Sequence, residues 1–236
     1  AISLGDSLSD AYKGNTEAGF KAPLSKLRTI SALYPNYIHF VAAADSGIKS
    51  FDDIKGKRIS VGAPKSGTEL NSRAILAAAG ISYKDFAKVE YLSYAESVEL
   101  MKNRQLDVTL LSSGAGVAAL RDLATSQKVV FLTIPEEIVK KIDDPAYQVG
   151  VIPANTYEGQ TSDVKTVSVQ NFLVTHSGVS EQTVYTMTKT MFENLDQMVA
   201  AHAAAKGIKL ENAAKNPPAP LHPGAERYYK EVGVLK

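Results

Sequence analysis

Residues 58–76 read Arg58-Ile-Ser-Val-Gly-Ala-Pro-Lys-Ser-Gly-Thr-Glu-Leu-Asn-Ser-Arg-Ala-Ile-Leu76, a short apolar run followed at once by a helix-capping pattern. Ser66 and Glu69 have the spacing of a capping box, which predicts a helix that begins near Gly67 directly after a buried strand. The first backbone N–H groups of such a helix lack intrahelical acceptors and lie at the positive end of its dipole. Together with the hydroxyls of Ser66 and Thr68, they form a predicted site for a carboxylate or a phosphate.

A nucleotide-binding P-loop is the obvious alternative, because Gly62 and Gly67 have the four-residue separation of the G-x-x-x-x-G-K-[ST] motif. Thr68 and Glu69 follow, so no Lys can reach nucleotide phosphates from this position, and a Glu there would repel them. A nucleotide site is therefore disfavoured. A second alternative stays open: the capped helix could serve stability alone and bind nothing.

Composition and charge limit the possible functions. The chain has 236 residues, 44% of them hydrophobic and 22% charged, which suits a globular protein of one domain or two. The 26 Lys and Arg against 25 Asp and Glu, without a basic run, argue against a nucleic-acid partner. The chain has no Cys, and none of its four His forms an H-x-x-x-H pair, so we predict neither a metal nor a cofactor. No apolar run approaches the roughly 20 residues that span a bilayer, and we expect no membrane-embedded part.

A second strand end of the same kind follows later in the chain. The apolar run 107–111 breaks into Ser112-Ser113-Gly114, which opens on another predicted helix. Strands and helices alternate from residue 57 to residue 133, and this alternation favours a mainly parallel sheet with helices on both faces.

The flanking segments differ in character. Residues 27–34 and 37–43 read as two strands separated only by Pro35-Asn36, and residues 164–175 predict a long strand that pairs back with them. Ser180 should cap a long amphipathic helix that ends near Ala203. The core-facing residues expected on that helix are Val184, Met187, Met191, Leu195 and Met198.

We therefore predict an α/β protein of two lobes with one lobe inserted into the other. Residues 46–150 form the inserted lobe, and residues 1–45 and 151–236 form the first. Two crossings, near 43–46 and near 150–160, would make the hinge. Ligands of α/β sheets bind at the carboxyl ends of strands and between lobes, so both predicted strand ends are candidate binding regions.

Several segments match a known family: Ala32–Pro35, Ala44–Ser50, Lys55–Gly62, Ser66–Glu69, Glu193–Asp196 and Pro220–Tyr229. Together they resemble the TAXI-type solute receptors of tripartite ATP-independent periplasmic (TRAP) transporters over essentially the whole chain. The resemblance implies a type II periplasmic binding protein fold, with two α/β lobes joined by a hinge. It also implies a periplasmic receptor, made with a signal peptide that is not in this chain. Such a receptor closes on glutamate, 2-oxoglutarate or a similar small dicarboxylate and delivers it to the TRAP membrane subunits.

The resemblance also implies a set of ligand-binding residues: Asp6, Tyr34, Ser66, Gly67, Thr68, Ser112 and Gly114. The helix terminus at Ser66–Thr68 would hold a ligand carboxylate, and Asp6 could receive an amino group or serve only as a cap. Gly5 stands where the family usually has Ser, which removes one hydroxyl. The family's opening strand, glycine-rich loop and helix have no counterpart here, so we expect a first lobe that is incomplete at its N-terminus.

The spacings place no nucleophile beside a base and no carboxylate pair, so we do not expect an enzyme. Two alternatives keep the same scaffold. One is an effector-sensing ligand-binding module of a regulator, and the other is a small transferase that holds a substrate phosphate at the helix terminus.

Overall fold

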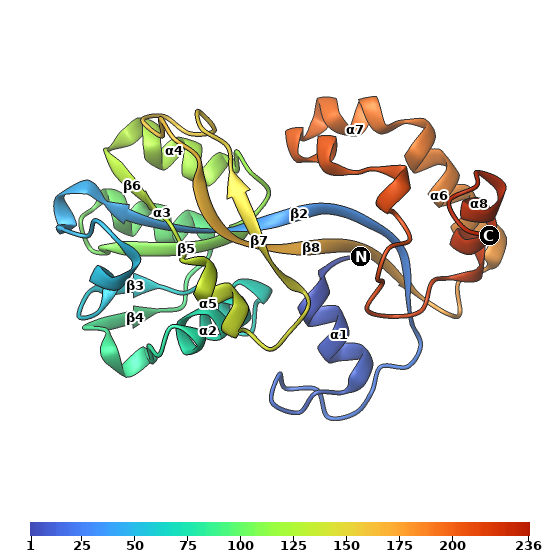
Figure 1. The fold of residues 1–236 in the computed structure, drawn as a ribbon, viewed down its shortest axis with the longest axis horizontal. Helices are drawn as coiled ribbons and strands as arrows, with labels where there is room; N and C mark the ends of the chain where they lie inside the picture. Colours follow the sequence, from blue (N-terminus) through green and yellow to red (C-terminus); the bar gives the residue numbers. More distant parts are fainter. The chain divides into compact units, whose positions relative to one another are not determined.

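The protein divides into two compact units. The computed structural model covers all 236 residues. Unit 1 comprises Ala1–Pro35 and Val169–Lys236, and unit 2 comprises Asn36–Ser168 (Figure 1). Both units combine helices with β-strands, so the predicted α/β class is confirmed.

The division between the units falls inside two strands. Strands β2 (Leu27–Ala43) and β8 (Val164–His176) each contribute residues to both units. The expected lobe boundaries, after residues 45 and 150, lie inside unit 2 instead. The chain passes from one unit to the other in extended conformation, within β2 and β8.

Unit 2 contains a mixed sheet that is parallel toward one edge. Its own strands are β3 (Arg58–Ser60), β4 (Lys88–Glu90), β5 (Val108–Ser113), β6 (Val129–Leu132) and β7 (Tyr147–Ile152). Strand β3 is parallel to both β4 and β5, but β2 is antiparallel to β5 and to β6. The sheet is therefore not mainly parallel as expected, because the long β2 runs against its neighbours.

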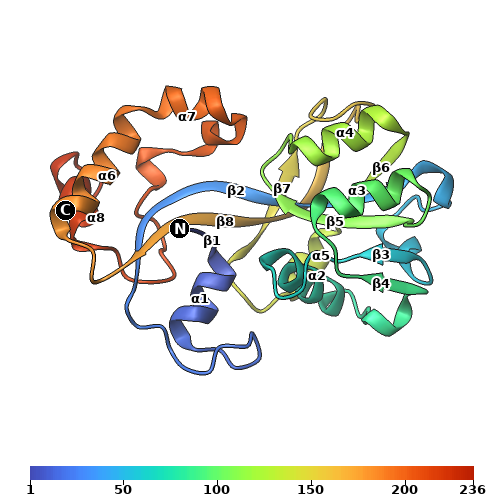
Figure 2. The same cartoon turned by 180° about the vertical axis from the view of Figure 1, so that it is seen from behind.

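Helices cover both faces of this sheet. They are α2 (Gly67–Ala78), α3 (Tyr94–Lys102), α4 (Ala118–Ser126) and α5 (Glu136–Lys141), with 3-10 turns at Ala44–Ser46, Phe51–Ile54 and Tyr83–Asp85. The chain crosses from β3 to β4 through α2 and returns past β3 to β5 through α3. Right-handed crossovers in opposite directions place α2 and α3 on opposite faces, as Figures 1 and 2 show. The core beneath α3 and α4 includes Val41, Met101, Leu111, Leu120 and Leu123.

Unit 1 packs helices around the outer parts of β2 and β8. Its own elements are β1 (Ile2–Leu4), α1 (Gly5–Lys13), α6 (Glu181–Glu193), α7 (Leu195–Ala201) and α8 (Pro223–Glu231), with 3-10 turns at Ala203–Gly207 and Leu210–Asn212. Strand β1 is antiparallel to β8, and α6 packs on α8 over Ile30, Val184 and Tyr229.

Several local predictions were wrong. Strand β2 is continuous through Pro35, because proline's fixed φ fits extended backbone and costs only one donor. The predicted long helix breaks at Asn194 into α6 and α7, and Met187 is 45% exposed while Met191 and Met198 pack inside. Helix α1 and strand β7 were not predicted. The pairing of β8 beside β2 is confirmed.

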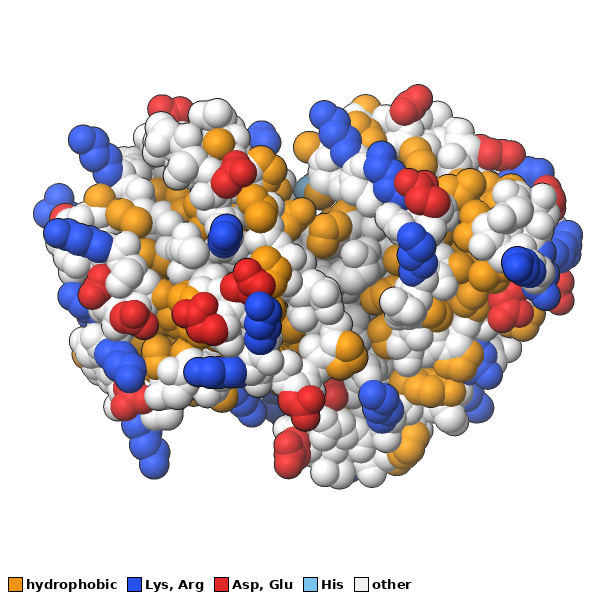
Figure 3. Space-filling view, in the orientation of Figure 1, with side chains coloured by type: hydrophobic (Ala, Val, Ile, Leu, Met, Phe, Trp, Pro, Cys, Tyr) orange, Lys and Arg blue, Asp and Glu red, His pale blue; other side chains and the backbone are white.

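The surface carries both signs of charge. On the face drawn in Figure 3, Lys and Arg side chains are interspersed with Asp and Glu over unit 2, in keeping with the net charge of +1. None of the helices combines the length and the apolar character that crossing a membrane requires.

Candidate functional site

The turn between β3 and α2 leads directly into the predicted helix terminus. Gly62 has φ +97, and a Cβ there would lie 2.7 Å from Cγ2 of Thr68, so only glycine fits this bend. Helix α2 begins at Gly67 as expected, and Oγ of Ser66 accepts a hydrogen bond from the N–H of Glu69 (3.2 Å). The N–H groups of Gly67 and Thr68 lie in the first turn, where no intrahelical acceptor exists.

The capping box forms only by half. The Glu69 carboxylate is 3% exposed and accepts hydrogen bonds from Arg73 (2.7 Å) and from the Tyr83 hydroxyl (3.0 Å) instead of from Ser66. Burial, and after it the charge of Glu69, raises the pKa of Tyr83, which therefore stays a donor. Arg73 and Tyr83 thus bind the Glu69 carboxylate away from the cap. The proton of the Ser66 hydroxyl therefore remains available for donation.

A chain of hydrogen bonds connects α2 with the end of β5. The Tyr94 hydroxyl donates to the carbonyl oxygen of Ser112 (2.6 Å), and Tyr94 Oη lies 2.9 Å from Oγ1 of Thr68. Because a carbonyl can only accept, Tyr94 spends its proton on Ser112, and the Thr68 hydroxyl must donate to Tyr94. Burial raises the pKa of Tyr94 and keeps this donor protonated. At Thr68, the backbone N–H remains as a donor for a ligand.

The side chain of Ser112 is buried and unpartnered. Ser112 is 3% exposed, and its Oγ has no hydrogen-bond partner in the structure. The Ser60 hydroxyl is hydrogen-bonded to the Ser97 hydroxyl of α3, so Ser60 points to the face of the sheet that α3 covers. Thr109 pairs in register with Ser60 and therefore points to the same face. Three residues further along β5, Ser112 faces the opposite side of the sheet, which is the side of α2. A buried hydroxyl without a partner is costly, and a ligand could supply that partner.

The loop after β5 is held by residues that the sequence did not single out. Gly114 is buried, and its carbonyl accepts from the Ser113 hydroxyl (3.1 Å). Two residues on, the N–H of Gly116 donates to the Tyr157 hydroxyl (2.9 Å), which also bonds to Nε2 of His39 (2.9 Å). Burial lowers the pKa of His39 to about 4 and raises that of Tyr157 to about 12, so both are neutral near pH 7.

The two remaining candidates belong to unit 1. Asp6 is buried in the first turn of α1 and accepts a hydrogen bond from the N–H of Ser7 (2.7 Å). The ring of Tyr34 in β2 stacks on His202 with centroids 6.0 Å apart. The structure thus joins Thr68 to Ser112 through Tyr94 within unit 2, whereas Asp6 and Tyr34 lie in the other unit.

Gly5, where TAXI-type receptors are expected to have Ser, has a packing reason. A Cβ on Gly5 would lie 3.1 Å from Cε2 of Phe172 and 3.3 Å from the carbonyl oxygen of Gln170. A serine at this position would force the Phe172 ring to move. Gly5 therefore allows a close contact between α1 and β8, which a serine with its hydroxyl would disturb.

The sequence comparison decides the family. A model of the NMT1-like family matches residues 1–233, which is nearly the entire chain. The chain belongs to the NMT1-like family. This assignment is coarser than the resemblance noted above, and membership of the TAXI-type receptors of TRAP transporters stays a prediction.

Solved structures similar to this NMT1-like chain include periplasmic binding proteins. The aliphatic sulphonate binding protein SsuA of Escherichia coli is 13% identical, with a TM-score of 0.47, and the match covers 100% of this chain and 62% of that one. The alkanesulfonate-binding SsuA of Xanthomonas axonopodis pv. citri, bound to MOPS, is 17% identical, with a TM-score of 0.45 and coverage of 92% and 62%. The NMT1-like chain thus spans less than two thirds of the length of either protein.

Of the site's supporting residues in this NMT1-like chain, Tyr94 left a signal in the sequence and Tyr157 did not. Tyr94 directly follows Ser93, the cap of α3, and so lies at the same sheet edge as the other strand ends. Tyr157 lies in the segment 144–160, whose Pro and Gly content disguised both β7 and the turn behind it. Their hydrogen bonds to Thr68 and to Gly116 join residues 26 and 41 positions apart, a separation that no local pattern encodes.

Proposed function

We propose that this chain is a non-enzymatic solute receptor that binds a small anionic solute, namely glutamate or a related dicarboxylate. The observation that carries the proposal is the donor cluster of unit 2. The start of α2 offers first-turn N–H groups and the Ser66 hydroxyl proton. Tyr94 connects Thr68 of the same turn to the end of β5, where the Ser112 hydroxyl lacks a partner.

The charges around the start of α2 support an anionic ligand. A carboxylate there would accept charge-assisted hydrogen bonds from backbone N–H groups at the positive end of the helix dipole. Glu69, the nearest carboxylate in sequence, is neutralised by Arg73 and hydrogen-bonded by Tyr83. The site therefore offers donors without a competing negative charge.

Isothermal titration of the chain tests the ligand class. We expect glutamate and 2-oxoglutarate to bind and glutamine, whose side chain is an uncharged amide, to bind more weakly. Ser66→Ala and Ser112→Ala should each weaken glutamate binding, whereas Thr68→Val should have a smaller effect because the Thr68 hydroxyl donates to Tyr94. If none of these solutes binds, or if the Ser66→Ala, Ser112→Ala double variant binds glutamate like the parent chain, the assignment fails.

The proposal extends to delivery and compartment. On the resemblance to TAXI-type receptors, the chain acts in the periplasm and passes its solute to the membrane subunits of a TRAP transporter. Reconstituted vesicles that carry such subunits should take up labelled glutamate only when the receptor is added outside. Uptake that is independent of the receptor would overturn the delivery step without affecting the binding assignment.

A further inference from the structure

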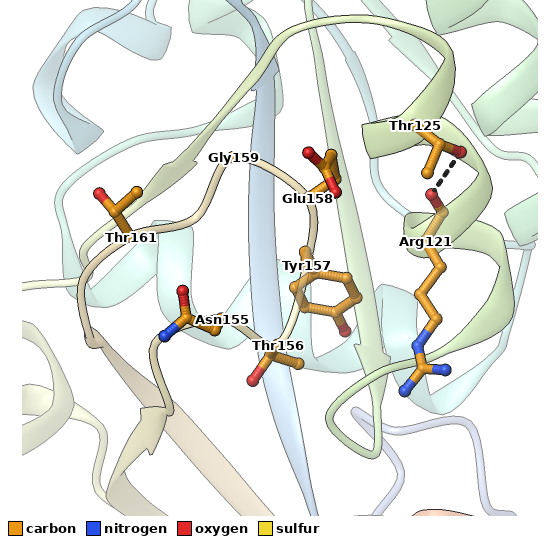
Figure 4. A pocket seen from close by; sticks show the side chains of 8 residues that line it. All are labelled: Arg121, Thr125, Asn155, Thr156, Tyr157, Glu158, Gly159 and Thr161. Carbon is orange, nitrogen blue, oxygen red and sulfur yellow. Dashed lines mark hydrogen bonds between the residues drawn. The ribbon is translucent and has the colours of Figure 1, made fainter.

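Unit 2 contains a second hollow that none of the predicted ligand-binding residues lines. It encloses about 530 Å³ between α4 and the loop that follows β7 (Figure 4). Arg121 and Thr125 of α4 form one wall, and residues 155–159 with Thr161 form the other. This pocket is separate from the donor cluster at the start of α2.

The loop wall is held in one conformation by its own hydrogen bonds. The side-chain amide of Gln160 is buried and donates to the carbonyl oxygens of Pro153 (2.9 Å) and Ser162 (3.0 Å). The N–H of Asn155 donates to the carbonyl oxygen of Gln160 (2.8 Å). A ligand would therefore enter a pocket that is already formed, and ordering the loop would cost little on binding.

Tyr157 contributes its ring to the pocket. It is 4% exposed, and its ring stacks on Phe131 with centroids 4.8 Å apart. Its hydroxyl is occupied by Gly116 and His39. The polar chemistry available to a ligand is therefore supplied by the side chains around the ring.

Two of those side chains carry opposite charges that do not neutralise each other. Arg121 and Glu158 are both exposed, and neither takes part in any ion pair of the chain. Figure 4 shows the guanidinium and the carboxylate pointing away from each other, with the Tyr157 ring between them. Nη2 of Arg121 lies 2.7 Å from where a Cβ on Gly116 would stand, so the guanidinium lies against the loop after β5.

A pocket lined by one positive and one negative side chain that do not pair with each other favours a ligand that also carries one charge of each sign. We infer that this pocket binds a small zwitterion of the amino acid class, with its carboxylate on Arg121 and its ammonium group on Glu158. A zwitterion can pair with both side chains at once, whereas a simple anion can pair only with Arg121 and a simple cation only with Glu158. The inference does not depend on the solute proposed for the α2 site.

Amide chemical-shift mapping by two-dimensional NMR tests this inference with named probes. The probes are glycine and 4-aminobutanoate, which carry both charges at different separations, and acetate and propylammonium, which carry one charge each. We expect at least one zwitterion to shift the amides of Gly116, Arg121 and residues 155–159, and to bind more tightly than either single-charge probe. Shifts confined to residues 66–68 and 112–114 would place the probe in the α2 site and would overturn the inference.

Variants that remove one charge each provide a second test of zwitterion binding. Arg121→Gln and Glu158→Gln should each weaken the zwitterion roughly tenfold or more, because each removes one charge-assisted contact. Arg104→Gln and Glu137→Gln remove the same charges elsewhere on unit 2 and should have no effect. All four side chains are exposed, and unchanged spectral dispersion verifies folding. Equal affinity in both pocket variants, acetate binding as tight as zwitterion binding, or no shift at millimolar probe would each overturn the inference.

Discussion

Helices α2 and α3 begin with the same pattern, a Ser followed three residues later by a Glu, but their first turns differ. At α3, the Glu96 carboxylate accepts hydrogen bonds from the N–H (2.9 Å) and the hydroxyl (2.7 Å) of Ser93, and the capping box is complete. At α2, the Glu69 carboxylate turns to Arg73 and Tyr83, and only the cap from Ser66 remains. The pattern thus determines where both helices start, while tertiary partners determine whether the Glu carboxylate stays at the cap, as in α3, or leaves it free of negative charge, as in α2.

The largest expected effect comes from placing a negative charge at the cap of α2. Aspartate caps a helix as well as serine does, so Ser66→Asp should fold normally. Its carboxylate would occupy the donors at the start of α2 and should weaken glutamate binding about 100-fold in isothermal titration. Ser180→Asp makes the same change at the cap of α6 in unit 1 and should leave the affinity unchanged. Parent-like binding by Ser66→Asp would show that the anion site lies elsewhere.

The next effect concerns the side chain that distinguishes the two turns. Glu69→Ala removes the buried acceptor of the Tyr83 hydroxyl and should lower the free energy of unfolding by about 2 kcal/mol in urea titrations. Glutamate affinity should not fall, because this carboxylate does not face the ligand. Glu99→Ala on α3, an exposed glutamate, is the control and should change stability by less than about 0.5 kcal/mol. A loss of affinity in Glu69→Ala would place the carboxylate at the ligand.

A smaller effect is expected at the start of α3, where the capping box is complete. Ser93→Ala removes the side-chain cap of α3 and should cost about 1 kcal/mol of unfolding free energy. Since α3 also supplies Tyr94, thermal melting and glutamate titration should be measured on the same sample. A binding loss larger than the stability loss would indicate that the α3 cap also positions Tyr94.

The smallest effect is a pH dependence of stability that comes from Glu96 in the capping box of α3. Hydrogen bonds from the Ser93 hydroxyl, and then from its N–H, hold the pKa of Glu96 below its ordinary value of 4.5. A carboxylate with a lowered folded-state pKa stabilises the protein above its unfolded-state pKa, and this contribution is lost as the pH falls through the folded-state pKa. The difference in urea midpoint between the parent and Glu96→Gln should therefore be constant near neutral pH and shrink below pH 4.5. A difference that does not vary with pH would contradict this.

The sequence predicted the start of α2 because capping is local. Gly67 and the strand before it were placed correctly, and so was the apolar β5. The direction of Glu69 could not be predicted, because it depends on Tyr83, which lies in a separate 3-10 turn 14 residues later. The continuity of β2 was missed because Pro35 is a turn signal in short segments and a tolerated residue in a long strand.

In the candidate site too, some residues could be predicted from local sequence and others could not. Strand ends and a helix terminus are visible in sequence, so Ser66, Thr68 and Ser112 could be named in advance. The hydrogen bonds of Tyr94 require the folded sheet edge, since they bring together residues from three separate elements. The charged pocket at Arg121 could not be anticipated, because the opposite wall belongs to a turn whose conformation depends on the buried amide of Gln160.

The direction of the hydrogen bonds from Thr68 through Tyr94 to the Ser112 carbonyl sets a rule for selectivity. The Thr68 hydroxyl donates its proton to Tyr94, and Tyr94 donates its proton to Ser112, so the Thr68 hydroxyl oxygen can offer a bound solute only lone pairs, while the Thr68 backbone N–H remains a donor. A solute that carries an N–H beside its carboxylate would satisfy those lone pairs, whereas a keto oxygen at the same place would be repelled. The orientation of two hydroxyl groups should therefore make the site prefer amino acids to the corresponding keto acids.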